Sequence, residues 1–179
     1  MILPTHRILN TINLAAHLHR HQSRHDENET PYITHLFSVA MYLASVTDDE
    51  NVIISGLMHD SLEDVPDYTY EDLVADCGED VARIVRGVTE DKALPYKERK
   101  LSYLEHLKTG TDECVIVSLA DKIHNAKSYI NMDATKKHDG HMLIFEEVLQ
   151  IAKSRLSTDH YAYPLVNELE KSIAHIKVQ

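Results

Sequence analysis

The chain has 179 residues, of which 43% are hydrophobic and 26% are charged, and its formal net charge is −11. A chain of this length can bury a hydrophobic core, its acidic balance argues against nucleic-acid binding, and no apolar run approaches the ~20 residues that a membrane-spanning helix needs. Cys77 and Cys114 form neither a disulfide framework nor a CxxC metal site, and the N-terminus lacks a signal-peptide pattern, so we expect a cytoplasmic, single-domain protein over residues 1–179.

The first clear helical pattern lies in PYITHLFSVAMYLAS, residues 31–45. Thr30 followed by Pro31 is typical of an N-cap and a first helical turn, so we expect this helix to begin there. Its apolar positions recur at intervals of three and four residues, at Ile33, Leu36, Phe37, Ala40, Leu43 and Ala44. The next helix is expected in DENVIISGLMHDSLEDVP, residues 49–66, and must end before Pro66.

The rest of the chain repeats this helical spacing. Val81, Ile84, Val85 and Val88 mark one segment, and residues 111–130, 142–156 and 163–176 carry the same periodicity. No segment alternates with a period of two, and no hairpin turn separates two apolar runs. The sequence therefore predicts an all-α fold.

An ionisable cluster interrupts the second helical pattern, in GLMHDSLEDV (56–65). On a continuous helix, His59 and Glu63 would share one strip of surface, and Asp60 and Asp64 would share another. Burying bare carboxylates without a counterion is costly, whereas a divalent cation would neutralise them and accept a neutral imidazole as a ligand. We therefore expect a metal site here.

Two other helices carry polar residues that could complete such a site. His35 lies in the second turn of the helix predicted from residue 30. Asp121 lies within VSLADKIHNAKS, where a polar strip at i, i+3, i+4 and i+7 consists of Asp121, His124, Asn125 and Ser128. Taken alone, a histidine such as His35 is more often a hydrogen-bonded core residue than a ligand, and Asp121 could equally be one half of a buried ion pair.

The order H…HDxxED…D resembles that of the HD-domain metal-dependent phosphohydrolases. The stretches HQSRHDENETPYITHLFSVA, GLMHDSLEDV, VTEDKALPYKERK and LADKIHNAKS resemble the hydrolase domain of RelA/SpoT-type alarmone enzymes, in particular the small alarmone hydrolases. The resemblance covers about residues 20–130 and implies a helical bundle with a central metal site. The implied activity is the removal of the 3′-pyrophosphate of guanosine tetra- or pentaphosphate, with manganese.

Site residues follow from this resemblance position by position. One Mn²⁺ ion, or another divalent metal, would be held by His35, His59, Asp60 and Asp121. Glu63 and Asp64 would orient and deprotonate the attacking water and manage the proton on departure. The nucleotide would meet the basic pair Arg24 and His25, where relatives carry a lysine at the second position, and also Asn125 and Ser128. Lys92 either adds positive charge near the phosphates or belongs to a solvated helix start.

The same residues leave two alternatives open. One is another HD phosphohydrolase, such as an NADPH 2′-phosphatase or a nucleoside monophosphate phosphatase. The other is a nucleotide-binding regulator without turnover. In each case the expected partner is a small nucleotide, with no nucleic acid or membrane, and the sequence does not indicate an oligomeric state.

Overall fold

The computed structural model describes residues 4–24, 26, 28–130 and 139–178. The described residues form helices and contain no strand beyond one isolated bridge between Ser23 and Pro31. The helices are α1 (His6–Leu18), α2 (Ile33–Ala44), α3 (Glu50–Met58), α4 (Ser61–Asp64), α5 (Tyr70–Cys77), α6 (Glu79–Val88), α7 (Tyr96–Thr109), α8 (Asp112–Ile130), α9 (Asp139–Arg155) and α10 (Tyr163–Val178). The predicted all-α fold is confirmed.

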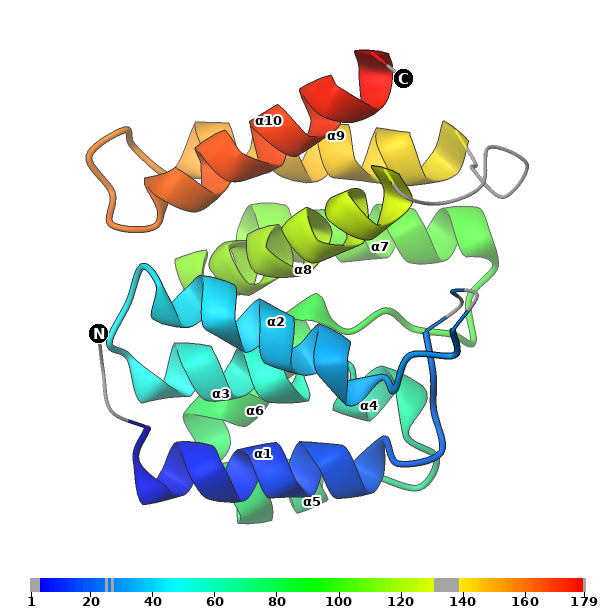
Figure 1. The fold of residues 1–179 in the computed structure, drawn as a ribbon, viewed down its shortest axis with the longest axis vertical. Coiled ribbons are helices and arrows are strands. Elements are labelled where there is room, and N and C mark those ends of the chain that lie inside the picture. Colours follow the sequence, from blue (N-terminus) through cyan, green and yellow to red (C-terminus); the bar gives the residue numbers. More distant parts are fainter. Residues whose placement is uncertain (1–3, 25, 27, 131–138, 179) are drawn as a thin grey trace.

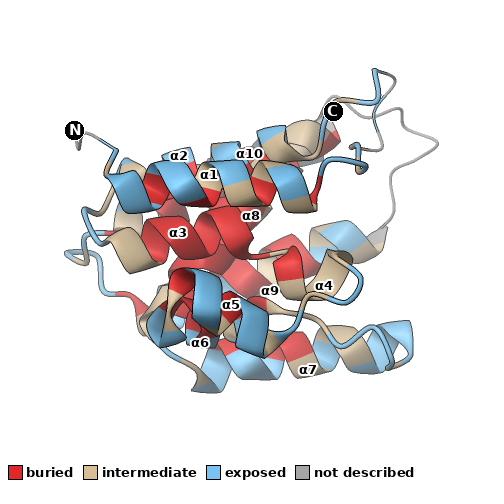
Figure 2. Ribbon diagram, turned by 90° about the horizontal axis from the view of Figure 1, so that it is seen from below, coloured by how far each residue is buried: buried red, intermediate tan, exposed pale blue. Residues whose placement is uncertain are grey.

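The bundle is organised around α8. This helix packs against α2, α3, α6, α9 and α10. Figure 1 shows α9 and α10 together at one end of the molecule and α1 with α5 at the other. The buried residues concentrate on α3 and α8, which carry the core between the outer helices (Figure 2). Within the described part of the chain, no helix is both long enough and apolar enough to span a bilayer.

Helix α2 begins at Ile33, so the expected start at Thr30 and Pro31 is wrong by one short turn. The backbone of this segment is engaged elsewhere. The N–H of Arg24 donates to the carbonyl of Thr30 at 2.8 Å, and the N–H of Tyr32 donates to the carbonyl of Gln22 at 3.0 Å. These bonds pair the segment with the chain that follows α1, and they bring Arg24 and Tyr32 to the same end of the bundle.

The ionisable cluster does not lie on one continuous helix. Helix α3 ends at Met58 and α4 begins at Ser61, so His59 and Asp60 occupy the turn between them. A new turn starts at Asp60, whose carbonyl accepts from the N–H of Asp64 at 2.8 Å. The continuous helix that was expected does not form, but Asp60 and Asp64 still face the same way, since the hydroxyl of Tyr32 bonds a carboxylate oxygen of each. The break instead presents two adjacent side chains, His59 and Asp60, in one direction.

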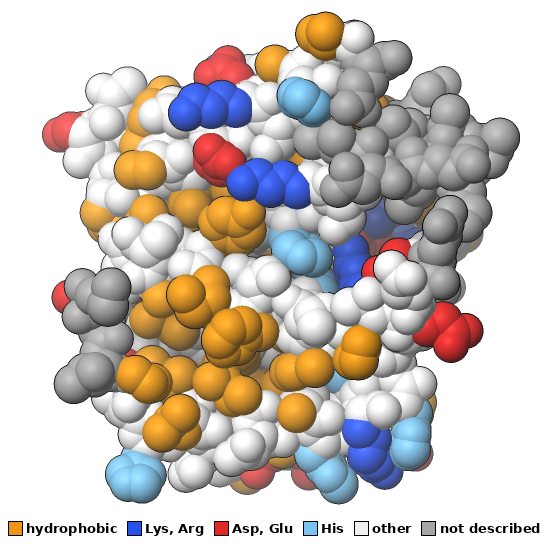
Figure 3. All heavy atoms as spheres, viewed as in Figure 1, with side chains coloured by type: hydrophobic (Ala, Val, Ile, Leu, Met, Phe, Trp, Pro, Cys, Tyr) orange, Lys and Arg blue, Asp and Glu red, His pale blue; other side chains and the backbone are white. Residues whose placement is uncertain are grey.

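One apolar face of α2 remains accessible. Phe37 and Met41 are 45% and 56% exposed, whereas Leu36, Val39 and Leu43 are fully buried. Figure 3 shows hydrophobic side chains gathered on this side of the molecule, over the middle of the bundle. The spacing of its apolar residues placed Phe37 on the buried face of α2. Only Leu36, Val39, Ala40 and Leu43 among the apolar residues of the helix are buried, so Phe37 lies at the edge of that face.

Candidate metal centre and active site

Four side chains from three parts of the chain converge at the centre of the bundle. His35 comes from α2, His59 and Asp60 from the α3–α4 turn, and Asp121 from α8. His35 Nε2 lies 3.2 Å from both His59 Nε2 and Asp121 Oδ1, and 3.5 Å from Asp60 Oδ2. His59 Nε2 lies 3.1 Å from Asp60 Oδ2 and 3.7 Å from Asp121 Oδ1. His35, His59 and Asp121 are buried.

These distances between side-chain atoms are close to those expected between the ligand atoms of one metal ion. Ligands held about 2.1 Å from one ion lie about 3.0 to 3.5 Å apart in octahedral or tetrahedral arrangements. His35, His59 and Asp121 each offer a ligand atom, and these atoms all lie within 4.8 Å of one another. Asp60 Oδ2 faces the same point through its short distances to both histidines.

A hydrogen bond on the side of His59 away from the cluster fixes which ring nitrogen faces the carboxylates. His59 Nδ1 lies 2.8 Å from the carbonyl oxygen of Gly56, which can only accept, so Nδ1 carries a proton. In neutral His59 the lone pair on Nε2 would then face two carboxylates. Without a metal, burial opposes a proton there, but Asp60 and Asp121 raise the pKa of His59 well above its usual value. A divalent ion can take the place of that proton.

Both carboxylates stay ionised in this environment. Burial opposes ionisation of Asp60, yet His59 and His35 hold its pKa well below the ordinary range. Burial also acts on Asp121, and there the Lys122 ammonium and the two imidazoles keep the pKa low. An anionic, nitrogen- and oxygen-lined cluster without sulfur is suited to a divalent cation.

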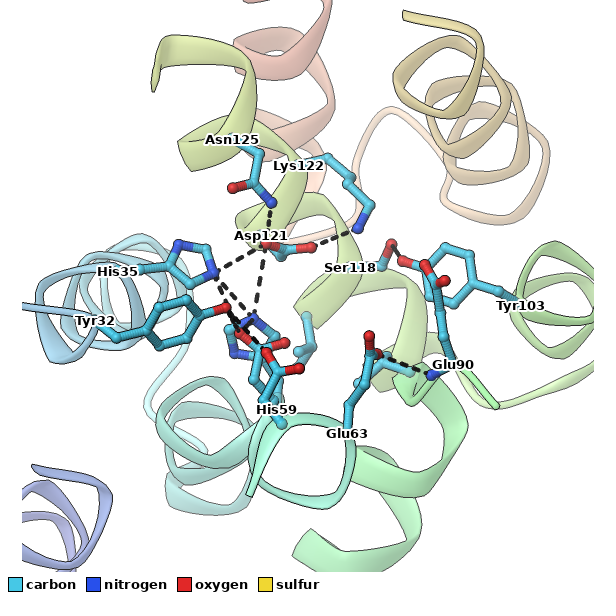
Figure 4. Close-up of a pocket in the computed structure, with 14 residues that line it drawn as sticks. Tyr32, His35, His59, Glu63, Glu90, Tyr103, Ser118, Asp121, Lys122 and Asn125 are labelled. Atoms are coloured by element: carbon cyan, nitrogen blue, oxygen red, sulfur yellow. Dashed lines mark hydrogen bonds and ion pairs between the residues drawn. The ribbon is translucent and has the colours of Figure 1, made fainter. Parts of the chain in front are cut away.

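A second layer of side chains orients these carboxylates. Tyr32 donates its hydroxyl to Asp60 Oδ2 at 2.7 Å. Lys122 Nζ lies 2.5 Å from Asp121 Oδ2, and Asn125 Nδ2 donates to Asp121 Oδ1 at 2.5 Å. Both oxygens of Asp121 are therefore held, and its Oδ1 faces the two imidazoles. Figure 4 shows Lys122 and Asn125 above Asp121 and Tyr32 beside His35.

The predicted acids of α4 lie in the same cavity, away from the metal-facing atoms. Glu63 Oε2 accepts from the backbone N–H of Glu90 at 3.1 Å, and burial raises the pKa of Glu63 above its usual value. Lys92 forms an ion pair with Asp64 and lies 3.7 Å from Glu63 Oε1. The two acids are thus close to the four converging side chains without joining them.

A cavity of about 140 Å³ connects these groups. Its walls include seven of the residues that the sequence singled out, namely His35, His59, Asp60, Glu63, Asp64, Asp121 and Asn125. The cavity lies between the imidazoles on one side and Glu63 on the other (Figure 4). Because one water needs about 10–15 Å³ on this measure, the cavity has room for a phosphate group together with ordered water.

The other predicted contacts are arranged around this cavity. Arg24 Nη2 donates to Asn125 Oδ1 at 2.9 Å, and its guanidinium lies 5.7 Å from the centre of the Tyr32 ring. Ser128 donates its hydroxyl to the carbonyl of His124 at 3.0 Å and does not line the cavity. Lys92 is half exposed and reaches the two acids of α4. His25 lies outside the described residues.

Several cavity residues were missed by the sequence analysis. Tyr32, Glu90, Tyr103, Ser118 and Lys122 all line it. Glu90 pairs with Lys100 at 2.5 Å and Arg99 at 3.0 Å, and Tyr103 and Ser118 share a hydrogen bond of 2.6 Å. Ser118 lies three residues before Asp121 on α8, and this helical spacing is the signal that could have found it.

Comparisons with known proteins agree with this geometry. A family model described as HD domain matches residues 11–151. The fold and the His–His–Asp cluster thus define the class, and this chain belongs to the HD-domain family.

Within that family the chain is similar to relatives named guanosine-3′,5′-bis(diphosphate) 3′-pyrophosphohydrolase MESH1. It is 44% identical to the Danio rerio protein over 123 residues, which is 67% of each chain. It is 33% identical to the Homo sapiens protein over 175 residues, which covers 95% of this chain and 92% of the relative.

A solved structure matches with a TM-score of 0.81 and 28% identity, over 96% of this chain and 97% of the other. It is described as a metazoan ortholog of SpoT that hydrolyzes ppGpp and plays a role in starvation responses. The resemblance noted in the sequence is confirmed, and the chain is a hydrolase of this family.

Proposed function

We propose that this chain is a manganese-dependent guanosine-3′,5′-bis(diphosphate) 3′-pyrophosphohydrolase that converts ppGpp to GDP and pppGpp to GTP, releasing pyrophosphate. The observation that carries the proposal is the convergence of two imidazoles and two carboxylates beside a separate pair of acids in one cavity. The similarity to relatives with this activity supplies the substrate class.

The metal would be held by His35, His59, Asp60 and Asp121. Imidazole nitrogen and carboxylate oxygen without thiolate suit manganese, and the resemblance to alarmone hydrolases favours that metal over others. When bound, the ion supplies charge stabilisation to phosphoryl oxygens and makes water more acidic. The chain's part is to keep four ligand atoms facing one point, through the bonds of Gly56, Tyr32, Lys122 and Asn125.

Glu63 would accept a proton from the attacking water. The water oxygen bonds to the phosphorus attached to the 3′-oxygen, the bond between that phosphorus and the 3′-oxygen breaks, and the 3′-oxygen takes up a proton. The raised pKa of Glu63 makes it a stronger base than an exposed glutamate. Asp64, paired with Lys92, would orient the water and assist proton return to the leaving oxygen.

The nucleotide would extend from the cavity towards Arg24, His25, Asn125 and Ser128. Arg24 carries a planar cation that suits both phosphate and a purine face. Lys92, which is half exposed and paired with Asp64 at the cavity, would add positive charge near the phosphates of an entering substrate.

A substrate panel tests the proposal. The purified protein is incubated with ppGpp, pppGpp, NADPH and nucleoside monophosphates, with Mn²⁺ or with a chelator, and phosphate and pyrophosphate are measured separately. We expect the wild type to release pyrophosphate from ppGpp and pppGpp with Mn²⁺ and not with the chelator. The variants His59→Ala and Glu63→Ala should release no product in either condition.

Two results would overturn this assignment. Faster release of phosphate from NADPH or a monophosphate would identify another HD phosphohydrolase. Tight calorimetric binding of ppGpp in Mn²⁺ without product would identify a nucleotide-binding regulator.

A further inference from the structure

A continuous chain of hydrogen bonds leads from Arg24 to the metal-facing oxygen of Asp121. Arg24 Nη2 donates to Asn125 Oδ1 at 2.9 Å, and Asn125 Nδ2 donates to Asp121 Oδ1 at 2.5 Å. That oxygen is the one that lies 3.2 Å from His35 Nε2. A guanidinium that makes no contact with a histidine or carboxylate of the cluster is therefore two hydrogen bonds away from it.

The amide of Asn125 can satisfy both neighbours in one orientation only. Its oxygen must face the guanidinium, which has donors alone, and its nitrogen must face the carboxylate, which has acceptors alone. Arg24 and Asp121 therefore hold the amide from opposite ends. Because Asn125 and Asp121 are one helical turn apart on α8, the backbone already places the amide within reach of the carboxylate.

Arg24 is also linked to the second carboxylate, Asp60, through Tyr32. Its guanidinium lies 5.7 Å from the centre of the Tyr32 ring, and the hydroxyl of Tyr32 donates to Asp60 Oδ2 at 2.7 Å. The backbone of Arg24 is held by its bond to the carbonyl of Thr30. One anchored side chain thus contacts both residues that orient the carboxylates, Asn125 on one side and Tyr32 on the other.

We propose that Arg24 is a positioning residue for the metal centre, acting through Asn125 on Asp121 and more weakly through Tyr32 on Asp60. The inference rests on the proposed metal ligation and goes beyond a nucleotide-binding role for Arg24. A phosphate or purine that draws Arg24 away from Asn125 would loosen the hold on Asp121, so the nucleotide side of the cavity and the metal centre communicate without direct contact.

A purely electrostatic effect of Arg24 would change the Mn²⁺ affinity in the opposite direction, so the affinity of an Arg24 variant tests the proposal. Removing a nearby positive charge lowers the repulsion of a bound cation and raises its affinity. Loss of positioning lowers the affinity instead. Mutation of a residue that orients a metal ligand directly lowers metal affinity by about 10- to 100-fold. Arg24 acts on Asp121 through Asn125, so we expect a smaller loss of about three- to tenfold.

The experiment measures Mn²⁺ affinity, by competition with a fluorescent chelator, in the absence of any nucleotide. The variants are Arg24→Met, Arg24→Gln, Asn125→Leu and the double variant Arg24→Met/Asn125→Leu. Arg20→Met is the matched control, because Arg20 is an exposed arginine near the end of α1 that bonds the carbonyl of His17. Circular dichroism and thermal unfolding check that each variant is folded.

We expect both Arg24 variants to bind Mn²⁺ more weakly than the wild type, and Arg20→Met to bind it equally. The loss caused by Arg24→Met should shrink markedly in the Asn125→Leu background, since the link to Asp121 is already cut. The proposal is overturned if the Arg24 variants keep or gain affinity, or if Arg24→Met lowers it by the same factor in both backgrounds. A wild type that binds no Mn²⁺ would refute the proposed metal centre itself.

Discussion

The Nδ1 atoms of His35 and His124 lie 2.8 Å apart, so one histidine donates a hydrogen bond to the other at the edge of the metal centre. His35 presents Nε2 to the cluster and can bind a metal there only if its proton is on Nδ1. His124 must then accept on Nδ1. Burial, together with the nearby His35 and Arg24, lowers the pKa of His124 to about 4, which keeps it neutral and able to accept.

His124→Phe should therefore weaken metal binding by about 10- to 100-fold, because His35 loses the acceptor that fixes its ring and its protonated nitrogen. Mn²⁺ affinity, measured by chelator competition, checks this. His124→Gln is the matched variant, since its amide oxygen can still accept. Equal affinity of the phenylalanine variant and the wild type would contradict a positioning role for His124.

Glu63→Gln should lower kcat by about 10²- to 10⁴-fold, the usual contribution of a general base, while Mn²⁺ affinity stays near that of the wild type. The amide keeps the size and the bond to the Glu90 N–H but cannot accept a proton. Steady-state kinetics with ppGpp and a parallel metal titration separate the two effects. A fall in metal affinity as large as the fall in kcat would instead assign Glu63 to the metal shell.

The pH profile of kcat offers an independent check on Glu63. Burial is the largest cause of its raised pKa, so the basic carboxylate is lost as the pH falls through a value above that of an exposed glutamate. Activity should accordingly decline on the acidic side at a higher pH than an ordinary glutamate would give. In Glu63→Gln this step should disappear from the residual activity. A profile with an unchanged acidic limb in the variant would point to another group.

Metal binding should stabilise the fold. An ion at 100 times its dissociation constant contributes about 2.7 kcal/mol, which for a chain of this length corresponds to roughly 5 to 11 °C in Tm. Thermal unfolding in Mn²⁺ and in excess chelator measures the difference. Asp121→Asn should lose most of the shift, because it removes a charged ligand atom next to both imidazoles. Identical Tm values for the wild type in the two conditions would contradict a metal centre at this position.

The helices were predictable because their apolar residues recur with helical spacing and few glycines or prolines interrupt them. Asp121 stood out for a related reason, as a carboxylate beside the apolar face of α8. The break at His59 and Asp60 was not predictable, since no glycine or proline marks it. Its long-range contact is made by Asp60, which faces the centre of the bundle and accepts from the hydroxyl of Tyr32, a residue of a distant segment.

The residues that surround the predicted ligands were harder to find, and the reason is geometric. Lys122 follows Asp121 directly, and neighbouring residues on a helix point about 100° apart, so a lysine there would ordinarily be solvated. Its side chain is only 13% exposed here, because it lines the cavity beside α8 and its charge is neutralised by Asp121 Oδ2. Tyr32 and Glu90 come from turns, whose side-chain directions the periodicity does not indicate.

Gly56 provides a last test, which connects the core with the metal centre. A Cβ atom at this position would lie 2.4 Å from Leu43 Cδ1 and 3.4 Å from the backbone of Ala40, so only glycine lets α3 approach α2 this closely. Leu43 is fully buried and cannot turn towards solvent. Gly56→Ala should therefore destabilise the protein by about 1 to 3 kcal/mol, although alanine ordinarily favours a helix.

The same substitution should also weaken Mn²⁺ binding, because a shift of α3 moves the Gly56 carbonyl that fixes His59. Leu43→Ala removes the clashing methyl groups and destabilises the core by itself. In that background, Gly56→Ala should cost little further stability and leave the metal affinity closer to that of Leu43→Ala alone. Urea unfolding and chelator competition on the four proteins measure both quantities. Additive losses in stability would show that the close approach of α2 and α3 at Gly56 is not what requires glycine.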